Sequence, residues 1–155
     1  MVVLGTRATV NSDAYRRSLH GISPGMVVES IACPLFVPLV EEGLTSESLT
    51  QAVLSHYLGH LLSAPPDIVL LGCTHYPLLM GHLKSYLPAS VRIVDSASAC
   101  ASYATQYLKE KGLAASPRNI GGEKFYVTDL SSDFYNQASR FLGHKIAYVE
   151  KSSVG

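Results

Sequence analysis

The chain has 155 residues, a length that suits one domain or two small ones and can bury a core without disulfides or metals. Hydrophobic residues make up 47% of it and charged residues 15%, which excludes the composition of a disordered chain. Twelve Lys and Arg balance twelve Asp and Glu, so no net charge drives binding to nucleic acid or to anionic membranes. We therefore expect a small or neutral partner.

The apolar stretches are too short to span a membrane, since residues 64–71 are interrupted by two prolines and Asp67. The N-terminus lacks the basic and long apolar regions of a signal peptide, so we expect a cytoplasmic protein. The three cysteines are odd in number and widely spaced, which favours reduced thiols over disulfides or zinc. His56 and His60 lack a third ligand, and no metal site is expected.

The first half of the chain alternates β-type and helical patterns. Residues 2–4 predict a strand that ends at Gly5, followed by a helix to about residue 19 whose candidate N-caps are Thr9, Asn11 and Ser12. Residues 27–31 predict a second strand, and the prolines and glycine of residues 34–43 predict a loop. Apolar residues at helical spacing then predict a helix from residues 45–46 to about 62.

The second half continues the alternation. The solid apolar run 68–71 predicts a central strand of a parallel sheet, and Pro77 and Pro88 mark the start and end of the next helix. Further along we expect, in order, a strand at 91–94, a helix capped by Ser96 or Ser98 and closed by Gly112, a loop at 114–122, a strand at 125–128, a helix at 132–142 and a strand at 146–149. Strands that alternate with helices predict a layered α/β fold with a mainly parallel sheet.

The junction after residues 68–71 carries groups suited to chemistry. Ligands gather where parallel strands end and helices begin, and Cys73 stands at such a point. A helix N-terminus and a protonated neighbour such as His75 can lower a thiol pKa, while Thr74 offers a hydroxyl and an N–H to a carboxylate. A buried apolar cysteine remains the commoner alternative for Cys73, and a structural turn residue is an equal alternative for His75.

Residues 71–79, Leu-Gly-Cys-Thr-His-Tyr-Pro-Leu-Leu, resemble the second cysteine motif of the glutamate racemases, in the superfamily of cofactor-independent amino-acid racemases. Residues 5–15 resemble the Gly-Thr-x-x-Thr turn of that family, and residues 32–43 resemble its middle loop. Residues 141–144 are similar to part of its C-terminal passage. The resemblance runs from about Val2 to Glu150 and implies the fold of the Asp/Glu racemases with one half incomplete.

The resemblance implies a reaction with two thiols, one on each face of the glutamate α-carbon, without cofactor or metal. Cys73 matches the second thiol, which acts on the L-glutamate face, and His75 would assist it. Glu41 matches a carboxylate that would tune His75 or the substrate ammonium; a solvated loop acid is an equal alternative. Substrate binding is implied for Thr74, Thr6 and Thr9.

The chain departs from the family in lacking about a hundred N-terminal residues, which would carry the first thiol in an Ala-Cys-Asn-Thr motif. We therefore expect residues 1–93 to form one complete half with Cys73, and residues 94–155 to form the returning portion of the other half. The implied function is the supply of D-glutamate for peptidoglycan by an enzyme that is a homo-oligomer at full length. With one thiol, the chain by itself is expected to be inactive.

Two alternatives remain open at this point. The first is an aspartate or hydantoin racemase, against which the Thr-His-Tyr-Pro sequence after Cys73 argues. The second is a non-enzymatic remnant or interaction module. Cys33 matches no catalytic position and is expected to be a packed small side chain, and Cys100, on a predicted helix, is expected to be structural.

Overall fold

The computed structural model describes residues 1–131 and 134–153 and has the expected α/β architecture. Two compact units, each described here by itself, comprise Met1–Glu110 (the first unit) and Lys111–Gly155 (the second unit). The expected boundary between residues 93 and 94 falls inside a strand of the first unit. The assignment of the two segments to racemase halves stays a prediction.

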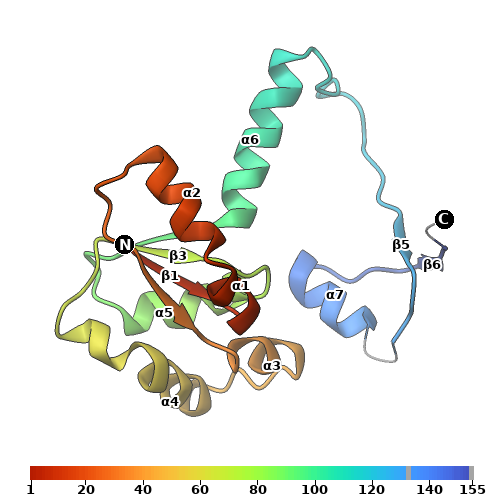
Figure 1. Ribbon diagram of the computed structural model, residues 1–155. Coiled ribbons are helices and arrows are strands. Elements are labelled where there is room, and N and C mark those ends of the chain that lie inside the picture. Colours follow the sequence, from red (N-terminus) through yellow and green to blue (C-terminus); the bar gives the residue numbers. More distant parts are fainter. Residues whose placement is uncertain (132–133, 154–155) are drawn as a thin grey trace. The chain divides into compact units, whose positions relative to one another are not determined.

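A four-stranded parallel sheet forms the centre of the first unit (Figure 1). The strand order is β2-β1-β3-β4. Leu4 pairs with Leu71 across β1 and β3, and both side chains are fully buried, as expected for the middle of a covered sheet. The prediction that residues 68–71 form a central strand is confirmed. The strands are β1 (Val2–Gly5), β2 (Glu29–Ala32), β3 (Ile68–Leu71) and β4 (Arg92–Asp95).

Helices cover both faces of this sheet, with α2 on one side and α4 and α5 on the other (Figure 1). Buried leucines of the later helices, among them Leu54 and Leu83, join the β-strand side chains in one core. The helices are α1 (Arg7–Ser12), α2 (Ala14–Ile22), α3 (Phe36–Glu41), α4 (Glu47–Leu58), the 3₁₀ segments η1 (Gly59–Leu62) and η2 (Tyr76–Leu79), α5 (Met80–Tyr86) and α6 (Ser96–Glu110).

The first helical region differs from the expected single helix capped at Thr9, Asn11 or Ser12. Its N-cap is Thr6, whose hydroxyl accepts a hydrogen bond from the Thr9 N–H at 3.2 Å. Asp13 adopts the left-handed conformation at φ 53° and separates α1 from α2. The chain turns into the helix directly after β1, so the cap is the first residue that follows the strand.

Helix α3 lies inside the stretch that we expected to be a loop. Pro38 is compatible with it because a proline in the first helical turn removes an N–H that has no intrahelical acceptor. Phe36, Leu39 and Val40 are buried and hold α3 against the core. Tertiary packing therefore overrides the loop signal of the prolines and Gly43.

Two helix starts are also corrected. Pro77 lies in η2, and the α-helix that it was expected to begin starts at Met80. The cap of α6 is Asp95 rather than Ser96 or Ser98, because its Oδ1 accepts a hydrogen bond from the Ser98 N–H at 2.7 Å. This backbone hydrogen bond to Ser98 lowers the pKa of Asp95.

The second unit contains a two-stranded parallel sheet, β5 (Phe125–Val127) and β6 (Val149–Lys151), connected through α7 (Phe134–Leu142). The last strand starts three residues later than the expected 146, and the predicted helix start at 132 lies outside the described residues. Ile146 and Val149 are buried, whereas Tyr126 and Tyr148 are 56% and 70% exposed. This small sheet thus leaves much apolar surface uncovered.

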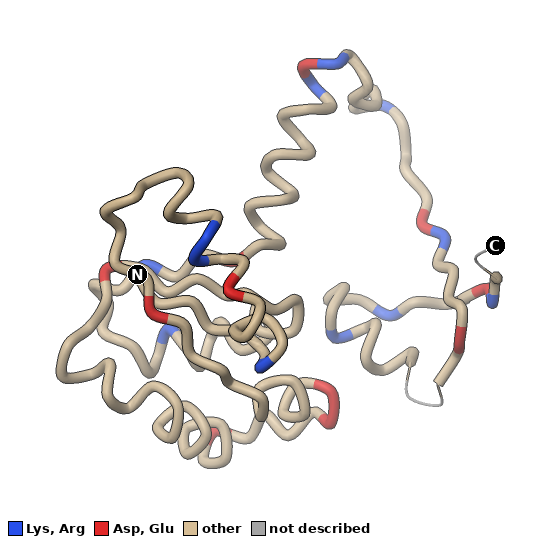
Figure 2. The backbone as a smooth tube through the Cα atoms, in the orientation of Figure 1, with Lys and Arg blue, Asp and Glu red and all other residues tan. Residues whose placement is uncertain are grey.

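The described residues contain no helix that is both long and apolar enough to cross a bilayer. Figure 2 shows Lys and Arg interspersed with Asp and Glu along the chain, consistent with the balanced composition.

Thr50 in α4 is fully buried, and its Oγ1 has no hydrogen-bond partner among the described residues. We expect Thr50→Val to raise the free energy of unfolding by about 1 kcal/mol, because it removes a hydroxyl that is desolvated without compensation. Urea unfolding followed by circular dichroism measures the change. Thr105→Val is the matched control, since Thr105 is exposed and its hydroxyl donates to the Ala101 carbonyl at 2.8 Å. A lower stability of Thr50→Val would contradict the prediction.

Candidate active site

Three neighbouring strands of the first unit end at the same edge of the sheet and place candidate residues there. Thr6 follows β1, Cys33 follows β2, and Gly72 and Cys73 follow β3. The Gly72 N–H donates to the Leu4 carbonyl at 2.7 Å, and the Cys33 N–H donates to the Gly5 carbonyl at 2.9 Å. These hydrogen bonds continue the parallel pairing past the strand ends, where ligands of such sheets bind.

Gly72 allows a close approach of the backbone immediately before Cys73. A Cβ atom at this position would lie 2.9 Å from Cε2 of Tyr15 and 3.0 Å from the Leu4 carbonyl oxygen. Both distances are shorter than van der Waals contact, and the carbonyl belongs to the rigid strand β1. The absence of a side chain at residue 72 therefore fixes how β3 leads into the Cys73 segment.

Cys73, His75 and Glu41 form a connected group of side chains. The Cys73 Sγ lies 3.9 Å from Nδ1 of His75, and Nε2 of His75 lies 3.0 Å from Oε1 of Glu41. Cys73 is half-buried, and the side chains of His75 and Glu41 are 25% and 44% exposed. Glu41 is the last residue of α3, the helix that the sequence did not predict. This helix places the Glu41 carboxylate beside His75.

The contact with Glu41 determines which nitrogen of His75 can accept a proton from the Cys73 thiol. An ionised carboxylate only accepts hydrogen bonds, so the short contact assigns a proton to Nε2 of His75. In the neutral ring Nδ1 is then the acceptor nitrogen, and this atom lies 3.9 Å from the Cys73 sulfur. The arrangement can move a proton between the thiol and the imidazole while Glu41 fixes the ring.

The three threonines occupy two places around this group. The Thr74 hydroxyl is exposed and lies 3.4 Å from Nδ1 of His75. Thr6 and Thr9 contact each other, with their hydroxyl oxygens 2.9 Å apart, at the end of the adjacent strand β1. The structure thus joins Thr74 directly to the Cys73 group and places the Thr6–Thr9 pair at the same sheet edge.

The other two cysteines have different surroundings. Cys33 is fully buried, as expected for a packed side chain, and burial raises the pKa of its thiol to about 12. Cys100 is exposed on α6, and its expected structural role stays a prediction. The helical spacing of residues in the sequence did not indicate that α6 has no buried residue.

Tyr76 is a buried residue beside the site to which the sequence alone assigned no role. Its hydroxyl donates to the Cys33 carbonyl at 3.0 Å. Burial, followed by the neighbouring Cys33 and Cys73, raises the pKa of this phenol, so it remains a protonated donor. Its position directly after His75 was the only available signal in the sequence.

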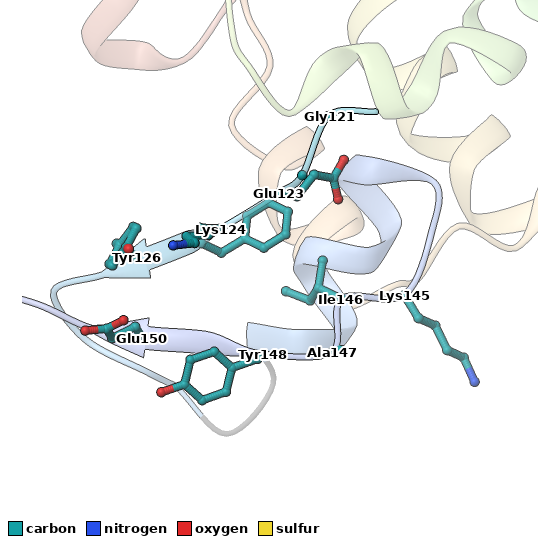
Figure 3. Close-up of a pocket in the computed structure, with 11 residues that line it drawn as sticks. Gly121, Glu123, Lys124, Tyr126, Lys145, Ile146, Ala147, Tyr148 and Glu150 are labelled. Carbon is teal, nitrogen blue, oxygen red and sulfur yellow. The ribbon is translucent and has the colours of Figure 1, made fainter. Parts of the chain in front are cut away.

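A hollow of about 790 Å³ lies in the second unit and contains none of the predicted site residues (Figure 3). It is lined by the two strands and the segments that lead into them, and Figure 3 shows Tyr148 and Lys145 projecting away from these strands. Residues 1–131 and 134–153 contain no group of three or more His, Cys, Asp or Glu side chains able to hold a metal ion. The group of Cys73, His75 and Glu41 is therefore the candidate active site.

Comparisons with known proteins point to one family, although no family model matches the chain. A glutamate racemase of Neisseria meningitidis serogroup A is 38% identical over 153 residues, which are 99% of this chain and 56% of that protein. A glutamate racemase of Synechococcus is 42% identical over 147 residues, covering 92% and 55% of the two chains.

Solved structures agree with these sequence matches. The glutamate racemase of Francisella tularensis in complex with D-glutamate superposes with a TM-score of 0.87 at 31% identity, over 98% of this chain and 57% of that one. The Thermus thermophilus glutamate racemase gives a TM-score of 0.79 at 36% identity, over 99% and 56% of the chains.

These relatives are amino-acid racemases, and the fold of the chain matches the fold of their solved structures. More particularly, the chain belongs to the glutamate racemase family and corresponds to the C-terminal portion of its members. The chain spans about 56% of the length of the curated relatives that it matches.

Proposed function

We propose that this chain contributes the Cys73 side of a cofactor-independent glutamate racemase that works with two thiols. The observation that carries the proposal is the connected group Cys73–His75–Glu41 at the carboxyl end of β3, in a segment that matches glutamate racemases almost throughout. The proposed substrate is glutamate, because the similar proteins are named for it and one of them is described in complex with D-glutamate.

In the proposed reaction the Cys73 thiolate removes the α-proton of L-glutamate. The α C–H bond breaks, an S–H bond forms, and the electron pair stays on the α-carbon as a carbanion. A second thiol on the opposite face then donates its proton to that carbon, which gives D-glutamate without net oxidation or reduction. Such general base and general acid steps each contribute roughly 10²–10⁴-fold to the rate.

The remaining roles follow from the contacts around Cys73. His75 accepts the thiol proton at Nδ1 and so prepares the thiolate, and Glu41 orients the ring from Nε2. Thr74 binds the α-carboxylate, and Thr6 and Thr9 bind further polar groups of the substrate from the end of β1. All of these are side chains of the first unit.

We further propose that residues 1–93 are one racemase half and that residues 94–155 complete another half with a polypeptide equivalent to the unmatched part of the relatives. The two-stranded sheet of the second unit supports this, because two strands alone are marginally stable and Tyr126 and Tyr148 remain largely exposed. That unmatched part would supply the second thiol. The physiological role would be the supply of D-glutamate for peptidoglycan in the cytoplasm, with a homo-oligomer as the full-length enzyme.

Solvent exchange at the α-carbon tests the role of Cys73. Although we expect the chain alone to be inactive as a racemase, in D₂O it should introduce deuterium into L-glutamate while forming no detectable D-glutamate, because one thiol can remove and return a proton on one face only. Cys73→Ser should abolish the exchange, whereas Cys100→Ser, at an exposed thiol on α6, should leave it unchanged. Full racemisation by the chain alone, or equal exchange in Cys73→Ser, would contradict the proposal. The same exchange measurement with aspartate in place of glutamate tests which of the two amino acids the chain accepts.

A further inference from the structure

A buried hydrogen bond links the Cys73 segment to the segment that leads into α3. Tyr76 is fully buried at the start of η2, and its hydroxyl donates to the carbonyl of Cys33 at 3.0 Å. Cys33 is held in turn by its own N–H, which donates to the Gly5 carbonyl at 2.9 Å. The tyrosine side chain thus connects the segment after β3 to the residue after β2, and the backbone of that residue is bonded in turn to the end of β1.

The same Cys33 carbonyl also anchors the beginning of α3. It accepts a second hydrogen bond, at 3.1 Å, from the N–H of Phe36, the first residue of that helix. The Phe36 ring packs edge-on against Tyr76, with the ring centres 5.1 Å apart and the planes at 73°. Tyr76 therefore fixes the first turn of α3 by a hydrogen bond and by ring packing together.

Helix α3 closes a cycle of contacts back to the site. Its last residue, Glu41, lies 3.0 Å from Nε2 of His75, and His75 directly precedes Tyr76 in the chain. Tyr76 thus contacts the start of α3, and His75 contacts its end. The position of the Glu41 carboxylate relative to the His75 imidazole consequently depends on where this short helix lies. A shift of the first turn of α3 would move Glu41 away from His75, because six residues form a single rigid element.

We propose that Tyr76 is a positioning residue, whose hydroxyl orients α3 so that Glu41 holds the His75 ring for proton exchange with Cys73. This inference rests on the roles proposed above for Cys73, His75 and Glu41. In this role Tyr76 acts through Glu41.

The test uses the full 155-residue chain and the Tyr76→Phe variant, which removes only the hydroxyl. The readout is the solvent exchange rate of the His75 Nε2 proton, observed by NMR of ¹⁵N-labelled histidine. We expect this rate to rise roughly tenfold in Tyr76→Phe, because the hydrogen bond to Glu41 opens more often. Glu41→Gln should raise it as well, and adding Tyr76→Phe to Glu41→Gln should have little further effect.

Tyr57→Phe is the matched control. Tyr57 contacts the same Phe36 ring, with centres 5.6 Å apart, and its substitution leaves the bond to Cys33 in place. An unchanged Nε2 exchange rate in folded Tyr76→Phe, or an equal rise in Tyr57→Phe, would overturn the inference. So would a full additional effect of Tyr76→Phe in the Glu41→Gln background.

A second measurement covers the case in which Tyr76→Phe does not fold. In the wild-type chain, the ring signals of Tyr76 and the His75 Nε2 proton should be lost at the same urea concentration if the two are one cooperative unit. Loss of the Nε2 signal while Tyr76 stays packed would overturn the inference. Deuterium exchange into glutamate is a separate readout, so a failure of the proposed function is distinguishable from a failure of the role of Tyr76.

Discussion

Phe36→Ala is expected to lower the free energy of unfolding of the first unit by about 3–5 kcal/mol. Phe36 is fully buried, and its ring packs edge-on against both Tyr57 and Tyr76. Truncation removes this aromatic contact area and leaves a cavity between α3 and the sheet core. Urea unfolding followed by far-ultraviolet circular dichroism measures the loss.

Leu35→Ala provides the comparison for this substitution. Leu35 directly precedes Phe36, but it is 48% exposed, so its truncation should change the stability by less than about 1 kcal/mol. If the two variants lose similar stability, the packing of α3 does not depend on the Phe36 ring. That result would also weaken the argument that α3 is a fixed support for Glu41.

Racemisation is expected to rise roughly 10²–10⁴-fold above the background of the chain alone, which forms no detectable D-glutamate, when the chain is combined with a polypeptide that covers the unmatched part of the Neisseria meningitidis glutamate racemase. The reason is that the second proton-transfer group of the proposed mechanism would then be present. Chromatography of the mixture detects the complex, and circular dichroism at a fixed wavelength follows the conversion of L- to D-glutamate.

Two substitutions make this complementation specific. Cys73→Ser should abolish the gain in racemisation without preventing the complex, whereas Cys100→Ser should preserve the gain. A complex that forms without any gain, or a gain that survives Cys73→Ser, would contradict the two-thiol proposal. Failure of the two polypeptides to associate would instead count against the proposed completion of residues 94–155.

The sequence allowed the sheet to be predicted because its central strands carry their own signal. Residues 2–4 and 68–71 are solid apolar runs, as strands buried on both faces must be, and both form central strands. The site motif was equally local, since only one residue, Thr74, separates Cys73 and His75 along the chain. Short-range patterns of this kind need no knowledge of the partner strands.

Features that depend on distant neighbours could not be predicted in the same way. The prolines around α3 indicate a loop unless the core that buries Phe36 and Leu39 is known. The break at Asp13 likewise depends on where β1 ends and how α2 packs, not on the helical pattern. The exposure of Cys100 reflects the lack of packing around α6, which its amphipathic spacing did not reveal.

By itself, then, the sequence determined the β-α alternation, the central strands and the cysteine–histidine pair, because apolar periodicity and short spacing are properties of neighbouring residues. Only the tertiary structure decided that Glu41, 34 residues from His75, meets the imidazole, and that Tyr76 bonds to the carbonyl of Cys33, 43 residues away. Both contacts arise because parallel strands bring distant chain segments to one sheet edge, and that pairing depends on the folded core as a whole.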